Sequence, residues 1–221
     1  MNTKKFINPY IEKVEENENI INNEKLAFSH KWKWNSFFNN KNPIILEIGT
    51  WLWNFFSNEV KINEDKNYIW LEIKFKRIYV SSKKSKEKWW KNFVLIKTSW
   101  QNIDKLFDEN EIKTTYVLFP DPWDKKDYQK KNKLLNCEFF EKLFYITENN
   151  WIFIFKTDNN EYFDLVLDIV EKMNLWNILK MSRDYEKEID SFDKTNLTEF
   201  ESIFRGQWLK INYLELLKKS H

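Results

Sequence analysis

The fold is decided by residues 44–53, IILEIGTWLW. A short apolar run that ends at a glycine predicts a buried strand, a tight turn and then a helix, which we place over residues 53–60. The pattern recurs at residues 68–73, YIWLEI, which again predict a strand carrying an acid near its end. Further apolar runs predict strands at 93–96, 115–119 and 152–155.

Helical periodicity separates these runs. We expect helices over residues 74–88, 136–148 and 160–173, then weaker strands at 177–182 and 208–214 around a helix at 197–204. Short apolar strands that alternate with helices are typical of an α/β fold with a mostly parallel sheet and helices on both faces. Residues 1–42 are polar and weakly patterned, so we expect a partly ordered N-terminal arm with at most a short helix, and one domain over residues 43–221.

Composition excludes several classes of protein. The 221 residues are 42% hydrophobic and 32% charged, and 36 basic against 34 acidic residues give a net charge of +2. This balance excludes a histone-like protein but leaves room for a local basic patch that binds nucleic acid. No apolar run is long enough for a membrane helix, and the first residues lack a signal core, so we expect a cytoplasmic protein. With Cys137, His30 and His221 as the only cysteine and histidines, we expect no disulfide and no metal site.

Glycine and tryptophan counts are unusual. The chain has 2 glycines and 12 tryptophans, whereas average usage would give about 15 glycines. Most of the tryptophans lie at predicted turns and strand ends, where glycine is favoured. One hypothesis is that UGA codons, which encode glycine in some bacteria, are translated here as tryptophan; the alternative is a protein naturally rich in tryptophan. Read as glycines, Trp51 and Trp53 would turn the first loop into EIGTGLG, and UGG codons at these positions would exclude the hypothesis.

Ligands of open α/β sheets bind at the carboxyl ends of the strands. Glu47 and Gly49 end the first strand in a turn that brings backbone close to a ligand, and Glu72 ends the second. A carboxylate at that place can accept both hydroxyls of a ribose. This pair of features is typical of sites for NAD or for S-adenosylmethionine.

A rigid acidic loop follows the fourth strand. Residues 119–123, FPDPW, hold Asp121 between two prolines, and lysines follow at 125, 126, 130, 131 and 133. An acid and an aromatic ring beside several lysines suit a base held over a phosphate backbone. Asp158, after Thr157, places another carboxylate at the same rim.

Together these motifs resemble the bacterial tRNA (guanine-N7-)-methyltransferases, which modify guanine 46 in the variable loop of tRNA. The resemblance extends from about residue 43 to about 215. It is carried, in order, by LEIG at 46–49, WLE at 70–72, FPDPW-x-KK at 119–126, TDxxxY at 157–162 and TEFE at 198–201. It implies a Rossmann-like methyltransferase fold with a seven-stranded sheet, S-adenosyl-L-methionine as cofactor and tRNA as partner.

The resemblance also implies roles for single residues. Asp121 matches the position assigned as catalytic. The cofactor contacts would be Glu47, Gly49, Glu72, Ser99 and Asp121, and the substrate contacts would be Lys125, Asp158, Thr198, Glu199, Phe200 and Glu201. Ser99 stands where the family has an acid, so its hydroxyl or backbone N–H would make the adenine contact. Lysines replace most of the family's arginines after residue 124, which keeps the charge but loses bidentate phosphate recognition.

The implied reaction needs no general base, since guanine N7 carries an exposed lone pair at neutral pH. The enzyme has to align N7 with the methyl group and the sulfur, and Asp121 would stabilise the positive charge that enters the purine. Two alternatives stay open: a methyltransferase of the same fold with another substrate, and a non-catalytic tRNA-binding protein whose cofactor loop is blocked by Trp51 and Trp53. A dehydrogenase would need a hydride-side His or a Tyr–Lys pair, which we do not find. The sequence leaves a monomer and a homodimer equally open.

Overall fold

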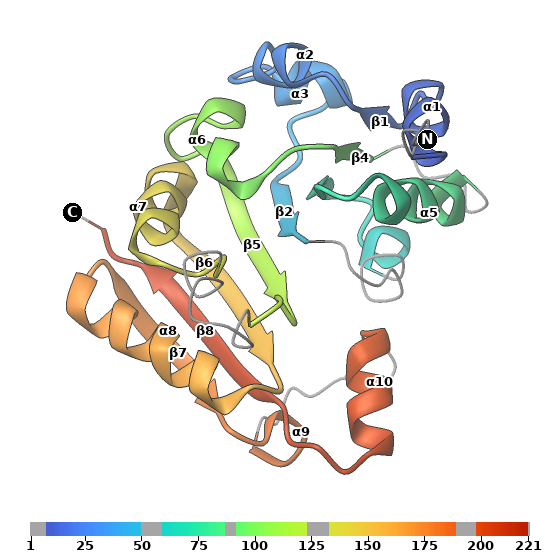
Figure 1. Cartoon of the computed structure of the whole chain (residues 1–221). Helices are drawn as coiled ribbons and strands as arrows, with labels where there is room; N and C mark the ends of the chain where they lie inside the picture. The colour runs from blue at the N-terminus through green and yellow to red at the C-terminus, as the bar shows by residue number, and fades with distance from the viewer. Residues whose placement is uncertain (1–7, 50–58, 87–91, 123–132, 189–197, 221) are drawn as a thin grey trace, which may run out of the picture.

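The computed structural model describes residues 8–49, 59–86, 92–122, 133–188 and 198–220, and within them all side chains except those of residues 85, 86, 199, 200 and 205. An eight-stranded sheet runs through the molecule (Figure 1). Its strands are β1 (Ile20–Ile21), β2 (Ile44–Ile48), β3 (Asn67–Leu71), β4 (Phe93–Ile96), β5 (Ile112–Leu118), β6 (Thr147–Thr157), β7 (Trp176–Ser182) and β8 (Asn212–Lys218). Their order is β1-β4-β3-β2-β5-β6-β8-β7, and only β8 runs antiparallel to its neighbours.

Helices pack on both faces of the sheet (Figure 1). They are α1 (Tyr10–Glu15), α2 (Glu24–Phe28), α3 (Trp34–Phe38), α5 (Phe75–Lys86), α6 (Ile103–Leu106), α7 (Cys137–Ile146), α8 (Asn160–Met173), α9 (Tyr185–Glu188) and α10 (Glu199–Gly206), with a 3-10 helix, η1 (Trp100–Asn102), before α6. A hydrophobic core lies on each face of the sheet, and successive residues of β2 contribute to different cores. Leu46 packs on the side of α7 and α8, and Ile45 packs on the side of α5. This alternation explains why β2 reads as a continuous apolar run.

Most predicted elements are confirmed. The helix expected over residues 160–173 has these bounds as α8, and the strands expected at 44–48 and 93–96 have theirs as β2 and β4. The Rossmann-like α/β fold is confirmed, but the sheet has eight strands instead of seven, because two residues of the N-terminal segment pair with β4. The helix expected over residues 53–60 lies mostly outside the described residues.

The N-terminal segment is more structured than its sequence indicates. The prediction of at most a short helix in residues 1–42 is wrong, since α1, β1, α2 and α3 all lie there. Trp34 anchors the segment: its side chain is fully buried, and its indole N–H donates to the carbonyl of Leu106 at 3.0 Å. A few widely spaced apolar residues provide this anchoring, and they are too sparse to produce a periodic signal.

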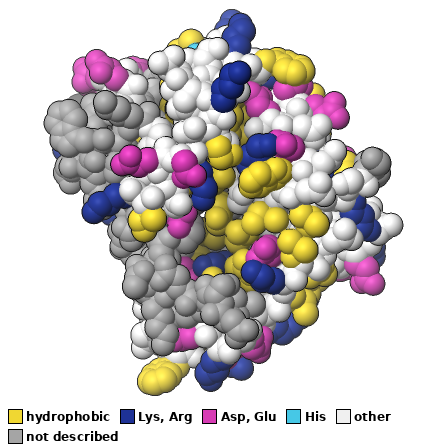
Figure 2. Space-filling model, turned by 180° about the vertical axis from the view of Figure 1, so that it is seen from behind, with side chains coloured by type: hydrophobic (Ala, Val, Ile, Leu, Met, Phe, Trp, Pro, Cys, Tyr) yellow, Lys and Arg dark blue, Asp and Glu magenta, His cyan; other side chains and the backbone are white. Residues whose placement is uncertain are grey.

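Charges of both signs are spread over the surface. On the face seen in Figure 2, hydrophobic side chains gather in the middle, and acidic and basic side chains are mixed around them. This mixture agrees with the small net charge of +2. Across the described ranges, no helix is both long and apolar enough to cross a membrane.

Candidate active site

A cavity of about 600 Å³ opens at the carboxyl ends of the central parallel strands. Four of the five predicted cofactor contacts line it, namely Gly49 after β2, Glu72 after β3, Ser99 after β4 and Asp121 after β5. Their convergence follows from the parallel sheet, because successive strands end at the same edge. The remaining wall includes Lys74, Arg77, Thr98, Trp100, Gln101, Phe119, Pro120 and Lys133.

Gly49 makes the turn at the end of β2 possible. Its φ is +86°, in the region that side chains disfavour, and its N–H donates to the carbonyl of Leu71 at 2.9 Å. Among the described residues, a Cβ added there would meet no atom within 4 Å. These residues therefore leave space beside the backbone of Gly49, which lines the cavity.

Glu72 is a buried carboxylate in the wall of the cavity. The residue is 3% exposed, and its Oε1 accepts the backbone N–H of Lys74 at 2.7 Å. Its Oε2 has no hydrogen-bond partner among the described residues, and the nearest guanidinium nitrogen of Arg77 is 3.9 Å away. Burial raises the pKa of Glu72, and the N–H of Lys74 and the charge of Arg77 oppose that rise. A buried carboxylate in a cavity wall, with one oxygen that accepts no hydrogen bond from the described residues, fits the hydroxyl pair of a ribose.

Glu47 lies deeper than the sequence indicates. It sits in β2 between Trp70 of β3 and Tyr116 of β5, is 6% exposed and is not part of the cavity wall. Burial raises the pKa of Glu47 well above its usual range, and the charge of Glu72 raises it further. Residues 50–58, which follow it, lie outside the described part of the chain, so a contact between Glu47 and the cofactor stays a prediction.

The loop that carries Asp121 is fixed by its first residue. Phe119 has a φ of +50° and donates its N–H to the carbonyl of Lys156 at 2.9 Å. Its ring packs against Phe204 of α10, with ring centroids 5.5 Å apart. Asp121 itself is exposed and lines the cavity. An acid on a stiff loop at the mouth of a cavity is suited to act on a bound base.

Sequence reasoning missed several residues of this cavity. Arg77, one of only three arginines in the chain, stands five residues after Glu72 and lies beside it across the first turn of α5. That spacing is a signal that could have found it. Trp100 packs on Phe139 with ring centroids 5.7 Å apart, and no local pattern predicted its place in the wall.

Asp158 belongs to a different hollow. At the end of β6 it joins an open depression of about 630 Å³ together with Asn160, Asp164, Arg183, Trp208, Leu209 and Lys210. Arg183 forms an ion pair with Asp164, and the amine of Lys210 lies 3.6 Å from a carboxylate oxygen of Asp184. The predicted substrate contact thus lies beside two cations and is not part of the wall of the first cavity.

The predicted substrate stretch 198–201 forms the start of α10. The hydroxyl of Thr198 accepts the N–H of Glu201 at 2.9 Å, and Glu201 Oε2 accepts the N–H of Thr198 at 2.8 Å. This reciprocal pair is a capping box, for which T-x-x-E is the sequence signature. The side chains of Glu199 and Phe200, and all of Lys125, lie outside what the structure describes.

Tyr162, the last residue of the TDxxxY motif, has a structural role. It is fully buried in α8, and its hydroxyl accepts the N–H of Leu135 at 2.9 Å. The amine of Lys133 lies 5.0 Å from the centre of its ring. Tyr162 therefore holds the chain directly after residues 123–132, which contain most of the predicted lysine stretch.

The tryptophans fall into two groups. Trp32 and Trp208 have φ values of +69° and +61° and are 72% and 94% exposed, as expected of glycine positions. Trp34 and Trp70, by contrast, are buried, with 0% and 1% of their surface exposed. Trp51 and Trp53 lie outside the described residues, so whether they block the cofactor loop stays a prediction. The conformation at 32 and 208 favours the recoding hypothesis at these two positions.

Comparison with known proteins agrees with this geometry. A family model described as "Putative methyltransferase" matches residues 41–211. A tRNA (guanine-N(7)-)-methyltransferase of Bdellovibrio bacteriovorus is 31% identical over 176 residues, which cover 80% of this chain and 83% of that protein. A bifunctional glycosyltransferase/methyltransferase of Fusobacterium nucleatum subsp. nucleatum is 30% identical over 202 residues, and this chain spans only 31% of its length.

The fold has counterparts among solved structures. The crystal structure of a 16S rRNA methyltransferase, KamB, matches with a TM-score of 0.62 at 10% sequence identity, covering 85% of this chain and 94% of that one. Identity this low shows a common fold only. Among the described residues, no group of three or more His, Cys, Asp or Glu side chains is placed to hold a metal ion.

Proposed function

The chain belongs to the tRNA (guanine-N(7)-)-methyltransferase family, and we propose that it transfers a methyl group from S-adenosylmethionine to N7 of guanine 46 in the variable loop of tRNA. One observation carries the proposal: Glu72, a buried carboxylate with an oxygen that accepts no hydrogen bond among the described residues, lines the same cavity as Asp121. A single pocket thus offers an acceptor for a ribose and an acid for a base. A protein that acts on tRNA belongs in the cytoplasm.

The described residues fit the cofactor. Glu72 would accept the ribose hydroxyls, and Ser99, which directly follows the buried Thr98, would face the adenine. Gly49 leaves the backbone open where the methionine part would pass. Glu47, whose pKa burial raises, would receive a proton or a cationic group more readily than an exposed glutamate.

Methyl transfer to guanine N7 requires alignment of N7 with the methyl group and needs no proton transfer to activate N7. When bound, S-adenosylmethionine supplies a methyl group on a positively charged sulfur that departs neutral. Guanine N7 already has a free lone pair, so the chain needs no base to activate it. Asp121 would accept the guanine N1–H and N2–H, which fixes the ring and stabilises the positive charge that it gains. The two prolines around Asp121 keep that carboxylate in place before the base arrives.

Binding of tRNA would use cations beside the cavity. Lys133 lies in the cavity wall, and in the sequence it follows the lysines at 125, 126, 130 and 131. Arg183 and Lys210 flank Asp158 in the second hollow. Lysine and arginine side chains at these places would hold phosphates of the tRNA backbone, and Asp158 would accept a hydroxyl or an amino group between them.

The decisive experiment follows the modified nucleoside. Purified protein is incubated with unmodified tRNA and S-adenosylmethionine, and the tRNA is digested to nucleosides for mass spectrometry. We expect 7-methylguanosine in tRNAs that carry guanine at position 46, and none in a tRNA whose only change is adenine at that position. A methyl group on another nucleoside would show a different substrate. Binding of tRNA with no methylation would favour the non-catalytic alternative.

A further inference from the structure

A buried ion pair joins β6 to α10. The amine of Lys156 lies 2.8 Å from Glu201 Oε1, and the two side chains are 6% and 0% exposed. None of the motifs that predict the function includes Lys156, which stands at the end of the apolar run of β6. Burying a charge is costly, so the ion pair of Lys156 with Glu201 is expected to have a function.

Both oxygens of the partner acid are used within the chain. Glu201 Oε1 accepts from Lys156, and its Oε2 accepts the backbone N–H of Thr198 at 2.8 Å. The hydroxyl of Thr198 is in turn used by the N–H of Glu201. These polar groups of the TEFE stretch therefore point into the chain and stabilise the first turn of α10.

The same lysine also reaches the loop that bears Asp121. Its backbone carbonyl accepts the N–H of Phe119, whose ring packs on Phe204 of α10. Lys156 thus contacts α10 through its side chain and the end of β5 through its backbone. Asp158 follows two residues later, so Lys156 lies between α10 and the two segments, at Asp121 and Asp158, that the proposed function assigns to the reaction.

Two aromatic rings lie beside the amine of Lys156. Its amine lies 4.2 Å from the ring centre of Tyr185 and 6.0 Å from that of Tyr213. These two rings stack on each other with centroids 4.5 Å apart. A buried ammonium enclosed by aromatic rings is attracted to their faces and cannot turn toward solvent.

We propose that Lys156 is a positioning residue: through Glu201 it fixes the first turn of α10 against the end of β5, and thereby sets the geometry in which guanine is held at Asp121. Thr198 and Glu201 act by holding this helix and do not touch the tRNA. The inference rests on the proposed function for its effect on activity. The link between Lys156 and α10 rests on the structure alone.

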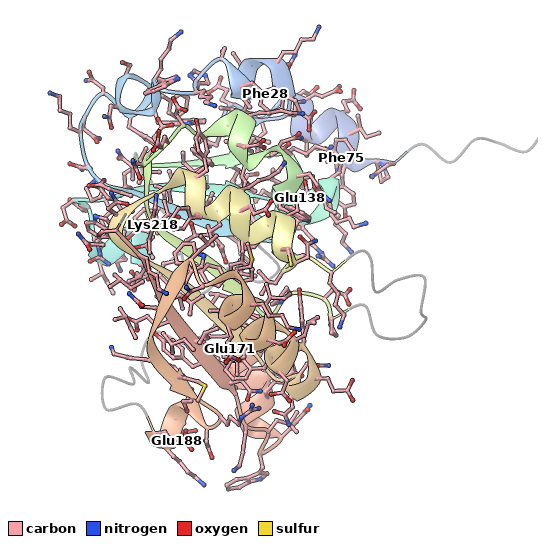
Figure 3. The ribbon with its side chains drawn as sticks, turned by 90° about the vertical axis from the view of Figure 1, so that its left-hand side faces the viewer. Phe28, Phe75, Glu138, Glu171, Glu188 and Lys218 are labelled. Atoms are coloured by element: carbon pink, nitrogen blue, oxygen red, sulfur yellow. The ribbon has the colours of Figure 1, made fainter. Side chains whose placement is uncertain are left out.

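The test compares two buried lysines. Lys156→Met removes the ion pair, and Lys218→Met is the matched control. Lys218 is also 5% exposed, and its amine donates to Asn110 Oδ1 at 2.9 Å and to the carbonyl of Thr147. It stands at the far end of β8, well separated from Glu188 of α9 (Figure 3), whereas Lys156 pairs with Tyr213 near the start of β8.

Both variants should lose stability, because each removes a buried cation from its acceptors. Only Lys156→Met should raise the KM for tRNA, by tenfold or more, while the Kd for S-adenosylmethionine stays within twofold. Lys156→Arg, which keeps the charge, should recover most of the loss. Equal changes in KM in the two Met variants would show that Lys156 is merely structural and would overturn the proposal.

Hydrogen exchange keeps the proposal independent of activity. Backbone amides of residues 198–206 should exchange faster in Lys156→Met than in the parent, and should be unchanged in Lys218→Met. If Lys156→Met does not fold, the double variant Lys156→Met with Glu201→Gln removes both charges and is measured in its place. An inactive parent would contradict the proposed function, whereas unchanged exchange in α10 would contradict this inference.

Discussion

Two buried glutamates at the active end of the sheet show how differently one residue type can be used. Glu72 and Glu201 are 3% and 0% exposed. Glu72 lines a cavity and keeps one oxygen without a hydrogen-bond partner among the described residues. Both oxygens of Glu201 are bonded within the chain. This difference indicates that Glu72 binds a ligand and that Glu201 stabilises the fold.

The physical reason lies in the cost of burial. Leaving a buried charged acceptor unpaired costs about 1–3 kcal/mol or more. Asp108 Oδ2, outside the cavity wall, is also buried without a hydrogen-bond partner among the described residues, so it is the position of Glu72 in that wall that suggests a ligand. Four predictions test this comparison between the cavity side and the α10 side.

The largest effect is expected at Asp121. Asp121→Ala should lower kcat by about 10²–10³, the usual cost of removing one well-placed electrostatic contact. Because Asp121 is exposed, the melting temperature should stay within about 1 °C of the parent. Asp158→Ala, a change of the same kind in the second hollow, should act mainly on the KM for tRNA. Turnover of Asp121→Ala within a few-fold of the parent would show that the carboxylate has another role.

Glu72→Gln tests the comparison itself. The change should weaken S-adenosylmethionine binding by about 10–100-fold, since hydrogen bonds to charged groups contribute about 1.5–3 kcal/mol. Thermal stability should hold or rise, because a buried charge is removed. Glu201→Gln should do the opposite and lower the melting temperature with the cofactor Kd unchanged. Calorimetric titration and thermal unfolding of both variants give the answer, and equal effects on binding would erase the distinction drawn here.

The strands and the cavity rim could be predicted from sequence, for a physical reason. Strands buried on both faces read as apolar runs, and the residue that follows each parallel strand must lie at one edge. Gly49, Glu72 and Asp121 were found in this way. Lys156 could not be found, because its partner lies 45 residues away and only the folded sheet brings α10 beside β6. The T-x-x-E signature at 198–201 is compatible with a capping box from sequence alone, and the hydrogen bonds between Thr198 and Glu201 establish it; the substrate contacts expected there stay a prediction.

The N-terminal helices were missed for a different reason. Each is short, and an isolated helix of this length is marginal in water. They are held by tertiary contacts such as that of Trp34 with Leu106. Such contacts leave no periodic trace in the sequence.

The ionisation of Glu47 should make the stability of the protein depend on pH. Its pKa is raised on folding, so the folded state holds the proton more tightly than the unfolded state. Folding is therefore favoured at low pH, and the free energy of unfolding falls as pH rises above the usual glutamate value of 4.5. Glu47→Gln removes this dependence: it should be more stable than the parent, on the order of 1 kcal/mol, at about pH 8. The gain should shrink as pH falls to about 5, which denaturant unfolding at several pH values measures.

The smallest effect is expected at two exposed tryptophans with positive φ angles, Trp32 in the N-terminal segment and Trp208 after α10. A side chain in the left-handed region costs roughly 1–2 kcal/mol, and glycine gives back about 0.5–1 kcal/mol of that through its greater freedom in the unfolded chain. Trp32→Gly and Trp208→Gly should therefore each stabilise the protein by roughly 0.5–1 kcal/mol. Trp34→Gly is the matched control, and it should destabilise the protein by about 3–5 kcal/mol because it empties a buried site. If both exposed replacements destabilise the protein as well, the positive φ angles do not mark glycine positions, and the recoding hypothesis loses its structural support. Sequencing of the gene completes the test. UGA codons at 32 and 208 with UGG at 34 would support recoding, because UGA can be read as glycine and would then stand at the two positions where glycine is the more stable residue.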